Sequence, residues 1–448
     1  DALAAPTHFY PNRESIESDL GPANGGFRRP GAHHPCAVLE SSRYTGDIDI
    51  LHSVRRFYDK PQRQDGKHSH PHRGLAAGEN TLHAQLIQLL IRAMLQTEDF
   101  VPHFLRSMHD FLVAEGADGE PAMHNDVYTY PWLRSYFERL SAAEASARVG
   151  PRRSAAAAVE RQKRRQPGRS SAPTDVPGSL LPLLIPIILS GVARSGNMDG
   201  RPKAPGLSGA RAKHEFAQTV HCCVELALEL LCSSSGERHE LSVGIPTDTG
   251  SDTIAMVRDT VSMWCETLWD VLSPLVKASH TPATVFARMV PAEQESRRSS
   301  QHSDLDPCDE LLLHLRGAAE SLTDEDGGMN SMSSVWTSNL QLSCMLGGDS
   351  ITRCTVLGGV LGAAVGFEGL PVTLVDSLRN SETHIALIHA FVSAVTEGNS
   401  VESQARIGPQ GVPHELQTCV HETVTANSNS PPAGVLIPAD RGALFTNL

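Results

Sequence analysis

The segment 344–371, CMLGGDSITRCTVLGGVLGAAVGFEGLP, places an acid and two hydroxyl residues directly before a run of small apolar residues. Asp349 or Ser350 can cap a helix there, because their side-chain oxygens accept hydrogen bonds from the free N–H groups of its first turn. Gly358 and Gly362 are four residues apart, which leaves a stripe of that helix without side chains. Glycine inside a helix costs about 1 kcal/mol relative to alanine. The segment therefore predicts a central buried helix of a soluble bundle, closely approached by another backbone.

Four further segments repeat the spacing of three and four residues that places apolar side chains on one helix face. They are 79–96, 215–232, 253–272 and 383–395. In the first of them, Leu82, Leu86 and Ala93 share a face, and Asn80 or Thr81 is the expected N-cap. Aromatic residues make up only 5% of the chain, and no alternating strand pattern stands out. The sequence therefore predicts an all-α fold.

Two polar stretches, 148–173 and 291–307, lack apolar periodicity and are typical of disordered insertions. We interpret them as insertions in a single domain that spans residues 1–448. The run 176–193 is apolar enough to raise the question of a membrane span, but three prolines interrupt it. A buried core segment is the preferred interpretation.

The formal charge of −13 argues against a general electrostatic contact with nucleic acid, and no membrane partner is expected. The nine cysteines are scattered and contain no CxxC pair, which favours buried thiols in a reducing compartment. The opening residues, DALAAPTHFYP, show no signal peptide. We expect an intracellular, cytoplasmic protein, and the basic run at 163–165 leaves the nucleus as an alternative.

Three stretches carry a family resemblance when they are taken together. They are GGDSIT before the small-residue helix (347–352), GENT at the head of an amphipathic helix (78–81), and the opening DALAAPTHFY. They resemble, in the same order, the G-G-D-x-D-T, T-D-D-T and G-D-A-x-x-x-P elements of the ADP-ribosylglycohydrolases. The resemblance implies that family's fold, an all-α orthogonal bundle of helices.

The resemblance also implies a metal site between two helix starts. The family's enzymes hold two divalent cations there, usually Mg²⁺, and hydrolyse the bond between ADP-ribose and a protein side chain or similar group. Carboxylates and a threonine hydroxyl suit Mg²⁺, which prefers hard oxygen ligands, and helix N-termini favour a pyrophosphate. Carried onto this chain, the motifs give Glu79, Asn80, Asp349 and Thr352 as metal ligands, Glu79 and Asp349 as catalytic residues, and Thr81, Gly347, Gly348 and Ser350 as ligand-binding residues.

This chain departs from the family at the metal positions. Gly78 stands in place of a threonine, Asn80 in place of an aspartate, and Ile351 in place of the second aspartate of the other motif. Four carboxylates have become two, and two carboxylates neutralise a pair of Mg²⁺ ions poorly. We expect one Mg²⁺ ion or none, with residues 79–81 and 349–352 converging on one cleft.

The first interpretation is an inactive or altered family member with a degraded metal site that binds ADP-ribose-like ligands. One alternative is an active, divergent hydrolase that cleaves the glycosidic bond of ADP-ribosylated groups with a single Mg²⁺ ion. A second alternative is a structural, crystallin-like protein, because DSITR resembles the D-S-x-S-R motif of the family's crystallin branch. The expected partner is ADP-ribose or an ADP-ribosylated substrate, and the sequence indicates no oligomeric state.

The histidines outside these motifs give weaker signals. KHSHPHR (67–73) has three histidines at alternate positions and could bind Zn²⁺ or Ni²⁺. No cysteine lies nearby and the setting is loop-like, so adventitious metal binding or none is the preferred interpretation. His33 and His34 have no partner at metal-ligand spacing, and no serine-hydrolase, Walker or dinucleotide-binding fingerprint occurs.

Overall fold

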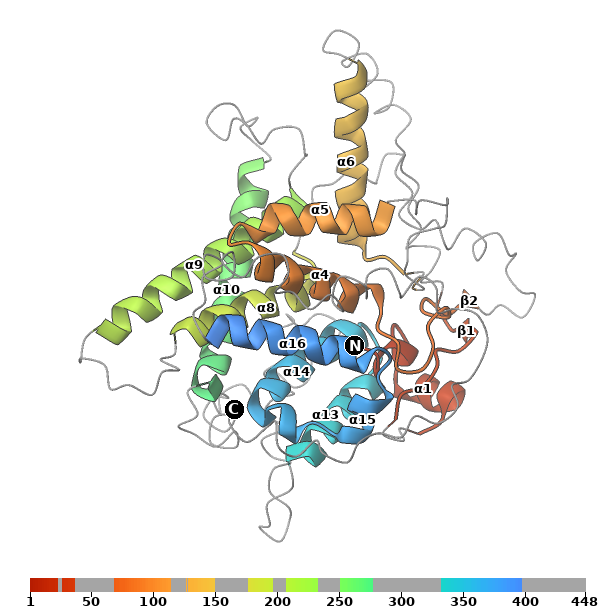
Figure 1. Cartoon of the computed structure of the whole chain (residues 1–448). Helices are drawn as coiled ribbons and strands as arrows, with labels where there is room; N and C mark the ends of the chain where they lie inside the picture. The colour runs from red at the N-terminus through yellow and green to blue at the C-terminus, as the bar shows by residue number, and fades with distance from the viewer. Residues whose placement is uncertain are drawn as a thin grey trace, which may run out of the picture. The chain divides into compact units, whose positions relative to one another are not determined.

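The computed structural model describes residues 1–22, 26–36, 68–113, 126, 128–149, 176–195, 207–232, 250–276 and 332–396. All of them belong to one compact unit, Asp1–Val401, and the second unit, Glu402–Leu448, lies outside the described residues. Within the described ranges the elements are helices apart from two short strands, which confirms the all-α class (Figure 1).

In chain order the elements are η1 (Ala5–Thr7), α1 (Arg13–Leu20), β1 (His33–His34), β2 (His68–Ser69), α4 (Leu82–Gln96), α5 (Phe100–Val113), α6 (Pro131–Val149), η3 (Gly178–Leu180), α8 (Leu181–Ser195), α9 (Leu207–Leu231), α10 (Gly250–Val276), α13 (Met332–Met345), α14 (Ser350–Val365), η6 (Phe367–Gly369), α15 (Val372–Ser377) and α16 (Ser381–Thr396). The first predicted insertion overlaps the end of α6 by two residues, and its remainder, 150–173, lies outside the described residues. The second predicted insertion, 291–307, lies outside them entirely.

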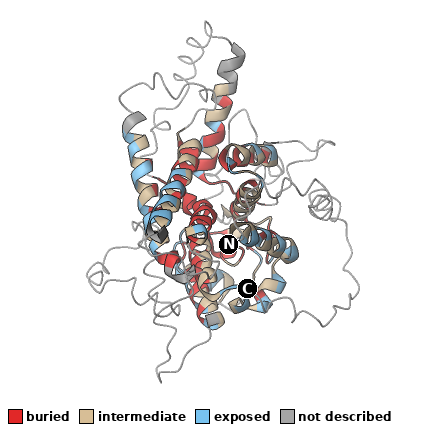
Figure 2. Ribbon diagram, turned by 60° about the vertical axis from the view of Figure 1, so that its left-hand side comes forward, coloured by how far each residue is buried: buried red, intermediate tan, exposed pale blue. Residues whose placement is uncertain are grey.

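Helix α8 is the centre of the bundle. It packs against α4, α9, α10, α14 and α16, and most of its side chains are buried, from Leu181 to Val192 (Figure 2). Pro182 is tolerated in the first turn, whereas Pro186 inside the helix removes one backbone hydrogen bond. The segment 178–195 is long and apolar enough to cross a membrane by length and composition, but here it forms the interior of the bundle, as expected for a core segment.

The four helices expected from apolar periodicity are present as α4, α9, α10 and α16. The expected face of α4 is buried at Leu82, Leu86 and Ala93, together with Leu90. Of the two expected N-cap residues, Asn80 and Thr81, the structure has Thr81, but its side chain makes no capping hydrogen bond. The acceptors at this helix start come from elsewhere in the chain.

Helix α14 is the small-residue helix, and Asp349 caps it. Its buried face is formed by its larger apolar residues, among them Ile351, Leu357 and Leu361. The expected close approach along the glycine stripe is wrong. A Cβ atom at Gly358 would make only an ordinary contact with Leu340, at 3.7 Å, and one at Gly362 would meet nothing within 4 Å.

Among the described helical glycines, the one with the least room for a side chain is Gly191 on α8. A Cβ atom there would overlap the hydroxyl of Thr219 on α9 and lie 3.1 Å from the ring of Trp269 on α10. The absence of a side chain at this position lets α8 lie against both helices at once. Packing around the central helix, rather than along α14, therefore imposes the glycine requirement.

Gly191→Ala should lower the free energy of unfolding by about 1–3 kcal/mol, because neighbouring side chains must move to admit the methyl group. The matched control is Gly362→Ala, which should stabilise the protein by up to about 1 kcal/mol, because the new methyl group meets open space in a helix. Urea denaturation followed by circular dichroism measures both. Equal stability of the two variants would contradict this account of the packing.

Candidate functional site

The N-terminal segment 1–10 contacts both helix starts that carry the predicted motifs. At the start of α4, the Asp1 carboxylate accepts hydrogen bonds from the Thr81 N–H at 2.9 Å and from the Thr81 hydroxyl at 2.8 Å. At the start of α14, the Ser350 hydroxyl donates to the Ala4 carbonyl at 3.2 Å, and Thr7 donates to Ser350 at 3.3 Å. The two motifs are thus brought to one segment, although they lie far apart in the sequence.

The loop before α14 is held by backbone contacts to the same segment. The Phe9 N–H donates to the Gly348 carbonyl at 2.7 Å, and the Gly348 N–H donates to the Tyr10 carbonyl at 2.8 Å. Gly347 has φ +78°, and a Cβ atom on it would overlap the Tyr10 carbonyl. The two glycines predicted to bind a ligand therefore have a clear conformational role, which is to let this loop lie against residues 9 and 10.

Asp349 uses both carboxylate oxygens within the protein. Oδ1 accepts from the Thr352 N–H at 3.1 Å, from His8 Nε2 at 2.9 Å and from the Tyr130 hydroxyl at 3.4 Å, while Oδ2 accepts from the Thr352 hydroxyl at 2.7 Å. Burial alone would raise the pKa of Asp349, but the bond and charge of His8 and the two bonds from Thr352 hold it well below its usual range. The side chain is still 34% exposed, so solvent reaches it.

His8 begins a chain of hydrogen bonds that runs inward from Asp349. Its Nδ1 lies 2.6 Å from His72 Nε2, and His72 Nδ1 lies 2.8 Å from Asp126 Oδ1. The other Asp126 oxygen accepts from the Leu82 N–H at 2.8 Å, in the first turn of α4. Asp126 thus supplies a capping acceptor that Thr81 does not, and the chain joins the start of α14 to the start of α4. Apart from Asp349, its members are almost fully buried.

Three hydrogen bonds link the four side chains of this chain, and each bond needs one proton. If both carboxylates are ionised and both imidazoles neutral, the His8–His72 contact has no proton and two lone pairs face each other. One further proton resolves the contact, so the four groups share three protons and carry a net charge of −1. Both carboxylates stay ionised whichever ring carries the proton between His8 and His72, because in either case His8 donates to Asp349 and His72 donates to Asp126.

The pKa shifts of the other members agree with ionised carboxylates at both ends of the chain and a neutral His8. Burial lowers the pKa of His8 to about 4, although the hydrogen bond and negative charge of Asp349 act to raise it. Burial would raise the pKa of Asp126, but the charge and hydrogen bond of His72 and the N–H groups of Leu82 and Tyr128 lower it. His8 is therefore neutral near pH 7, while Asp126 is ionised.

The other predicted site residues take partners on a different part of the bundle. Glu79 accepts from the Ala76 N–H at 2.8 Å and pairs with Arg379 at 3.2 Å. The Asn80 amide lies 3.1 Å from His384 Nε2 on α16. These two side chains therefore contact the 372–396 region and their own loop, whereas Asp349 contacts His8, Tyr130 and Thr352.

The donor groups at the predicted metal positions do not fit a pair of Mg²⁺ ions. Magnesium needs oxygen ligands in octahedral geometry at about 2.0–2.1 Å. The oxygens of Asp349 already accept protein hydrogen bonds, one oxygen of Glu79 faces a cation, and Ile351 is 0% exposed with its alkyl group in the core. Across the described ranges, no group of three or more His, Cys, Asp or Glu side chains is arranged to hold a metal ion.

The sequence patterns miss most of the residues that contact Asp349. No motif marks His8 or Tyr130, and KHSHPHR favours adventitious metal binding or none, although His70 and His72 are buried. The antiparallel pairing of His34 with His68 places this histidine segment beside residues 33–36. An available signal was the density of histidines in a loop without cysteine, which could have suggested a buried hydrogen-bonded cluster.

His83 is a second buried histidine near this site. It follows Leu82 in the first turn of α4, is 1% exposed, and its ring centroid lies 4.8 Å from that of Tyr130. Neither of its ring nitrogens has a hydrogen-bond partner among the described residues. Burial lowers its pKa to about 4, partly opposed by the charge of Asp349.

His72→Ala should lower the free energy of unfolding by about 3–5 kcal/mol, because it leaves the buried Asp126 carboxylate without its imidazole partner and breaks the link to His8. The control is His221→Ala on the exposed surface of α9, which should change stability by no more than about 0.5 kcal/mol. Denaturant unfolding at neutral pH measures both. A loss of similar size in both variants would show that the hydrogen-bond chain does not support the fold.

His83 should make the protein less stable in acid. Its folded pKa lies below the unfolded value of about 6.5, so its contribution is complete above pH 6.5 and is lost as the pH falls toward 4. The shift corresponds to about 3 kcal/mol by pH 4. His83→Phe removes this proton uptake, so the variant should lose less stability between pH 7 and pH 4 than the wild-type protein does. Urea unfolding midpoints of both proteins, measured from pH 7 to pH 4, test this prediction. Parallel pH profiles for the wild-type protein and His83→Phe would refute it.

Comparison with known proteins places this site in a family. Searches of curated proteins and of solved structures find no significant match. A family model described as ADP-ribosylglycohydrolase matches residues 1–400, which is most of the chain and includes every residue of the site described above. The chain therefore belongs to the ADP-ribosylglycohydrolase family.

Proposed function

We propose that this chain is a non-hydrolytic or altered family member in which internal hydrogen bonds hold the two helix starts where the family's enzymes hold metal ions. The observation that carries the proposal is the use of the Asp349 carboxylate, whose oxygens accept from His8, Tyr130 and Thr352. The surviving acid of the other motif, Glu79, is paired with Arg379. Both acids therefore already have partners within the protein.

The hydrogen bonds that Asp349 accepts also support a metal-independent site. A divalent cation that bound the Asp349 oxygens in the directions from which His8 and the Thr352 hydroxyl donate would have to displace one of these donors. Each displaced donor would be left buried and unpaired, which costs about 1–3 kcal/mol. We therefore propose no metal ion at this site, and a single weakly bound Mg²⁺ ion is the alternative.

The exposed third of Asp349 is the feature that suits an ADP-ribose-like ligand. Ribose hydroxyls donate hydrogen bonds, and an ionised carboxylate that solvent reaches can accept them without a metal ion. A pyrophosphate has less to gain here, because Asp126 and Asp349 already neutralise the starts of α4 and α14. We propose that any ligand is recognised through its ribose and is indifferent to Mg²⁺.

A structural role of the crystallin-like kind is the second candidate. The observation that favours it is the capping of both helix starts by the protein's own carboxylates, which removes the most favourable place for a diphosphate. This candidate and ligand binding differ in one measurable property, which is affinity for free ADP-ribose.

We expect the purified protein to release no ADP-ribose from ADP-ribosylated peptides with or without Mg²⁺, and to bind free ADP-ribose equally well in both conditions. Calorimetry and a product assay by chromatography measure the two quantities, with Asp349→Ala as the control that should abolish binding. Mg²⁺-dependent hydrolysis that Asp349→Ala removes would contradict the proposal and establish the one-ion enzyme. No binding at millimolar ADP-ribose would favour the structural candidate.

A further inference from the structure

We propose that Cys344 and Cys354 are an oxidisable dithiol that closes to a disulfide when it meets a peroxide. The two sulfur atoms lie 3.5 Å apart, and both residues are buried. Cys344 is in the last turn of α13, and Cys354 is in the first turns of α14. The loop that carries Asp349 connects the two, so the pair brackets the site without belonging to it.

The distance between the sulfurs is close to what a disulfide requires. An S–S bond is about 2.0 Å long, so the two atoms must approach each other by roughly 1.5 Å. The α13 and α14 helices pack against each other, and the Arg353 guanidinium holds the turn between them. It donates to the Ser343 hydroxyl at 3.0 Å, to the Ser343 carbonyl at 2.8 Å and to the Gly347 carbonyl at 2.6 Å.

Position makes the two thiols unequal. Cys344 lines a surface pocket, whereas Cys354 does not line it and lies in contact with the Cys344 sulfur. One sulfur is therefore placed to meet an oxidant, and the other is placed to complete the disulfide.

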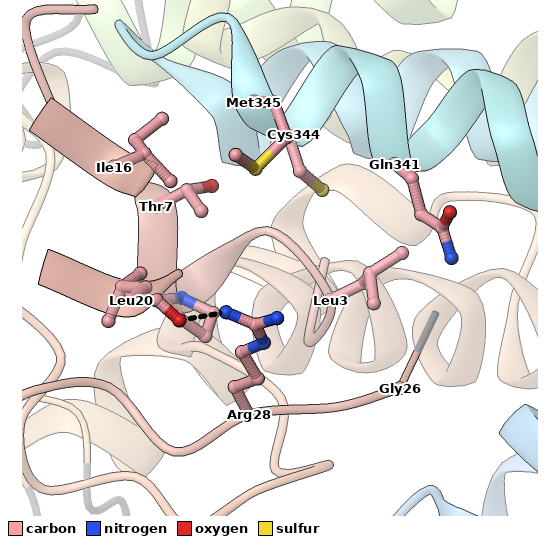
Figure 3. Close-up of a pocket in the computed structure, with 10 residues that line it drawn as sticks. Leu3, Thr7, Ile16, Leu20, Gly26, Arg28, Gln341, Cys344 and Met345 are labelled. Atoms are coloured by element: carbon pink, nitrogen blue, oxygen red, sulfur yellow. Dashed lines mark hydrogen bonds between the residues drawn. The ribbon is translucent and has the colours of Figure 1, made fainter. Parts of the chain in front are cut away.

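A small surface pocket gives access to this pair. Figure 3 shows Cys344 and Met345 on α13 facing a pocket whose other walls include Leu3, Thr7 and Leu20. None of the residues predicted to bind metal or ADP-ribose lines it. A molecule as small as hydrogen peroxide can approach the sulfur of Cys344 through this pocket, with Cys354 in contact behind it.

The oxidation balances with one peroxide molecule. The Cys344 sulfur, as a thiolate, attacks one oxygen of the peroxide, the O–O bond breaks, and a sulfenic acid forms on Cys344 while the displaced hydroxide takes a proton and leaves as water. The Cys354 sulfur then attacks the Cys344 sulfur, and the sulfenic hydroxyl leaves with the thiol proton as a second water. Two thiols are oxidised, and the peroxide is reduced to two water molecules.

The disulfide would close a ring of residues 344–354 around the Asp349 loop. One side of that loop is already held by the Gly348 bonds to Phe9 and Tyr10. A covalent link between α13 and α14 would hold the other side. Amide hydrogen exchange in residues 346–353 should therefore slow on oxidation, while exchange in α9 and α10 should not change.

The experiment uses the full-length, reduced protein. It is treated with hydrogen peroxide, unfolded in an alkylating agent, and digested without reductant, and the peptides are identified by mass spectrometry. We expect a cross-linked peptide that joins Cys344 to Cys354, that is reversed by dithiothreitol, and that is absent in Cys354→Ser. Cys222→Ser, which removes a half-buried thiol on α9, should leave the cross-link unchanged.

The chain also supplies a matched pair of control thiols. Cys223 on α9 and Cys265 on α10 are both 0% exposed, and neither lines the pocket of Figure 3. They should stay reduced at peroxide concentrations that oxidise Cys344 and Cys354. The proposal is overturned if the wild-type protein oxidises at Cys36 while Cys344 and Cys354 remain thiols, or if the cross-link forms only after unfolding. Because these outcomes are read on the wild-type protein, a variant that fails to fold does not affect the test.

Discussion

The chain of hydrogen bonds from Asp349 through His8 and His72 to Asp126 is the interaction on which the arrangement of the site depends. A helix begins with N–H groups that have no partner inside the helix. Asp349 satisfies one at α14, and Asp126 satisfies one at α4. The two histidines join these acceptors through the interior, so the position of one helix start fixes the position of the other.

Burying these groups is costly unless every hydrogen-bonding atom has a partner. Taking an ion out of water costs several kcal/mol, and a good pairing geometry has to offset it. The shared proton between His8 and His72 makes each contact of the chain a hydrogen bond and reduces its net charge from −2 to −1. This balance explains why the N-terminal segment lies between the two motifs, because His8 has to reach Asp349 and His72 at the same time.

Most of the fold, but only part of the site, can be predicted from the sequence. The helical periodicity of α4, α9, α10 and α16 is local, and the Asp349 cap is visible beside its helix, so both could be predicted. His8, His72 and Asp126 could not, because their contacts join residues 54 to 341 positions apart and no local pattern records them. The directions of Glu79 and Asn80 depend on Arg379 and His384, which come from another part of the bundle. The packing prediction from the glycine stripe is wrong, because a glycine shows where another backbone can approach and does not show that one approaches there.

The same charge count explains why an apolar residue, Ile351, suits this position. Its side chain is 0% exposed, so a carboxylate in its place would be buried beside a hydrogen-bond chain that already carries a net charge of −1. Two Mg²⁺ ions could neutralise such a carboxylate, but shared protons could not. A site of this kind is therefore self-consistent in two forms, with four carboxylates and metal ions, or with fewer carboxylates and an apolar group facing the core. Ile351 and the amide of Asn80 both belong to the second form, as the proposed metal-independent function requires, and restoring one carboxylate without its cation would place an uncompensated charge in the interior.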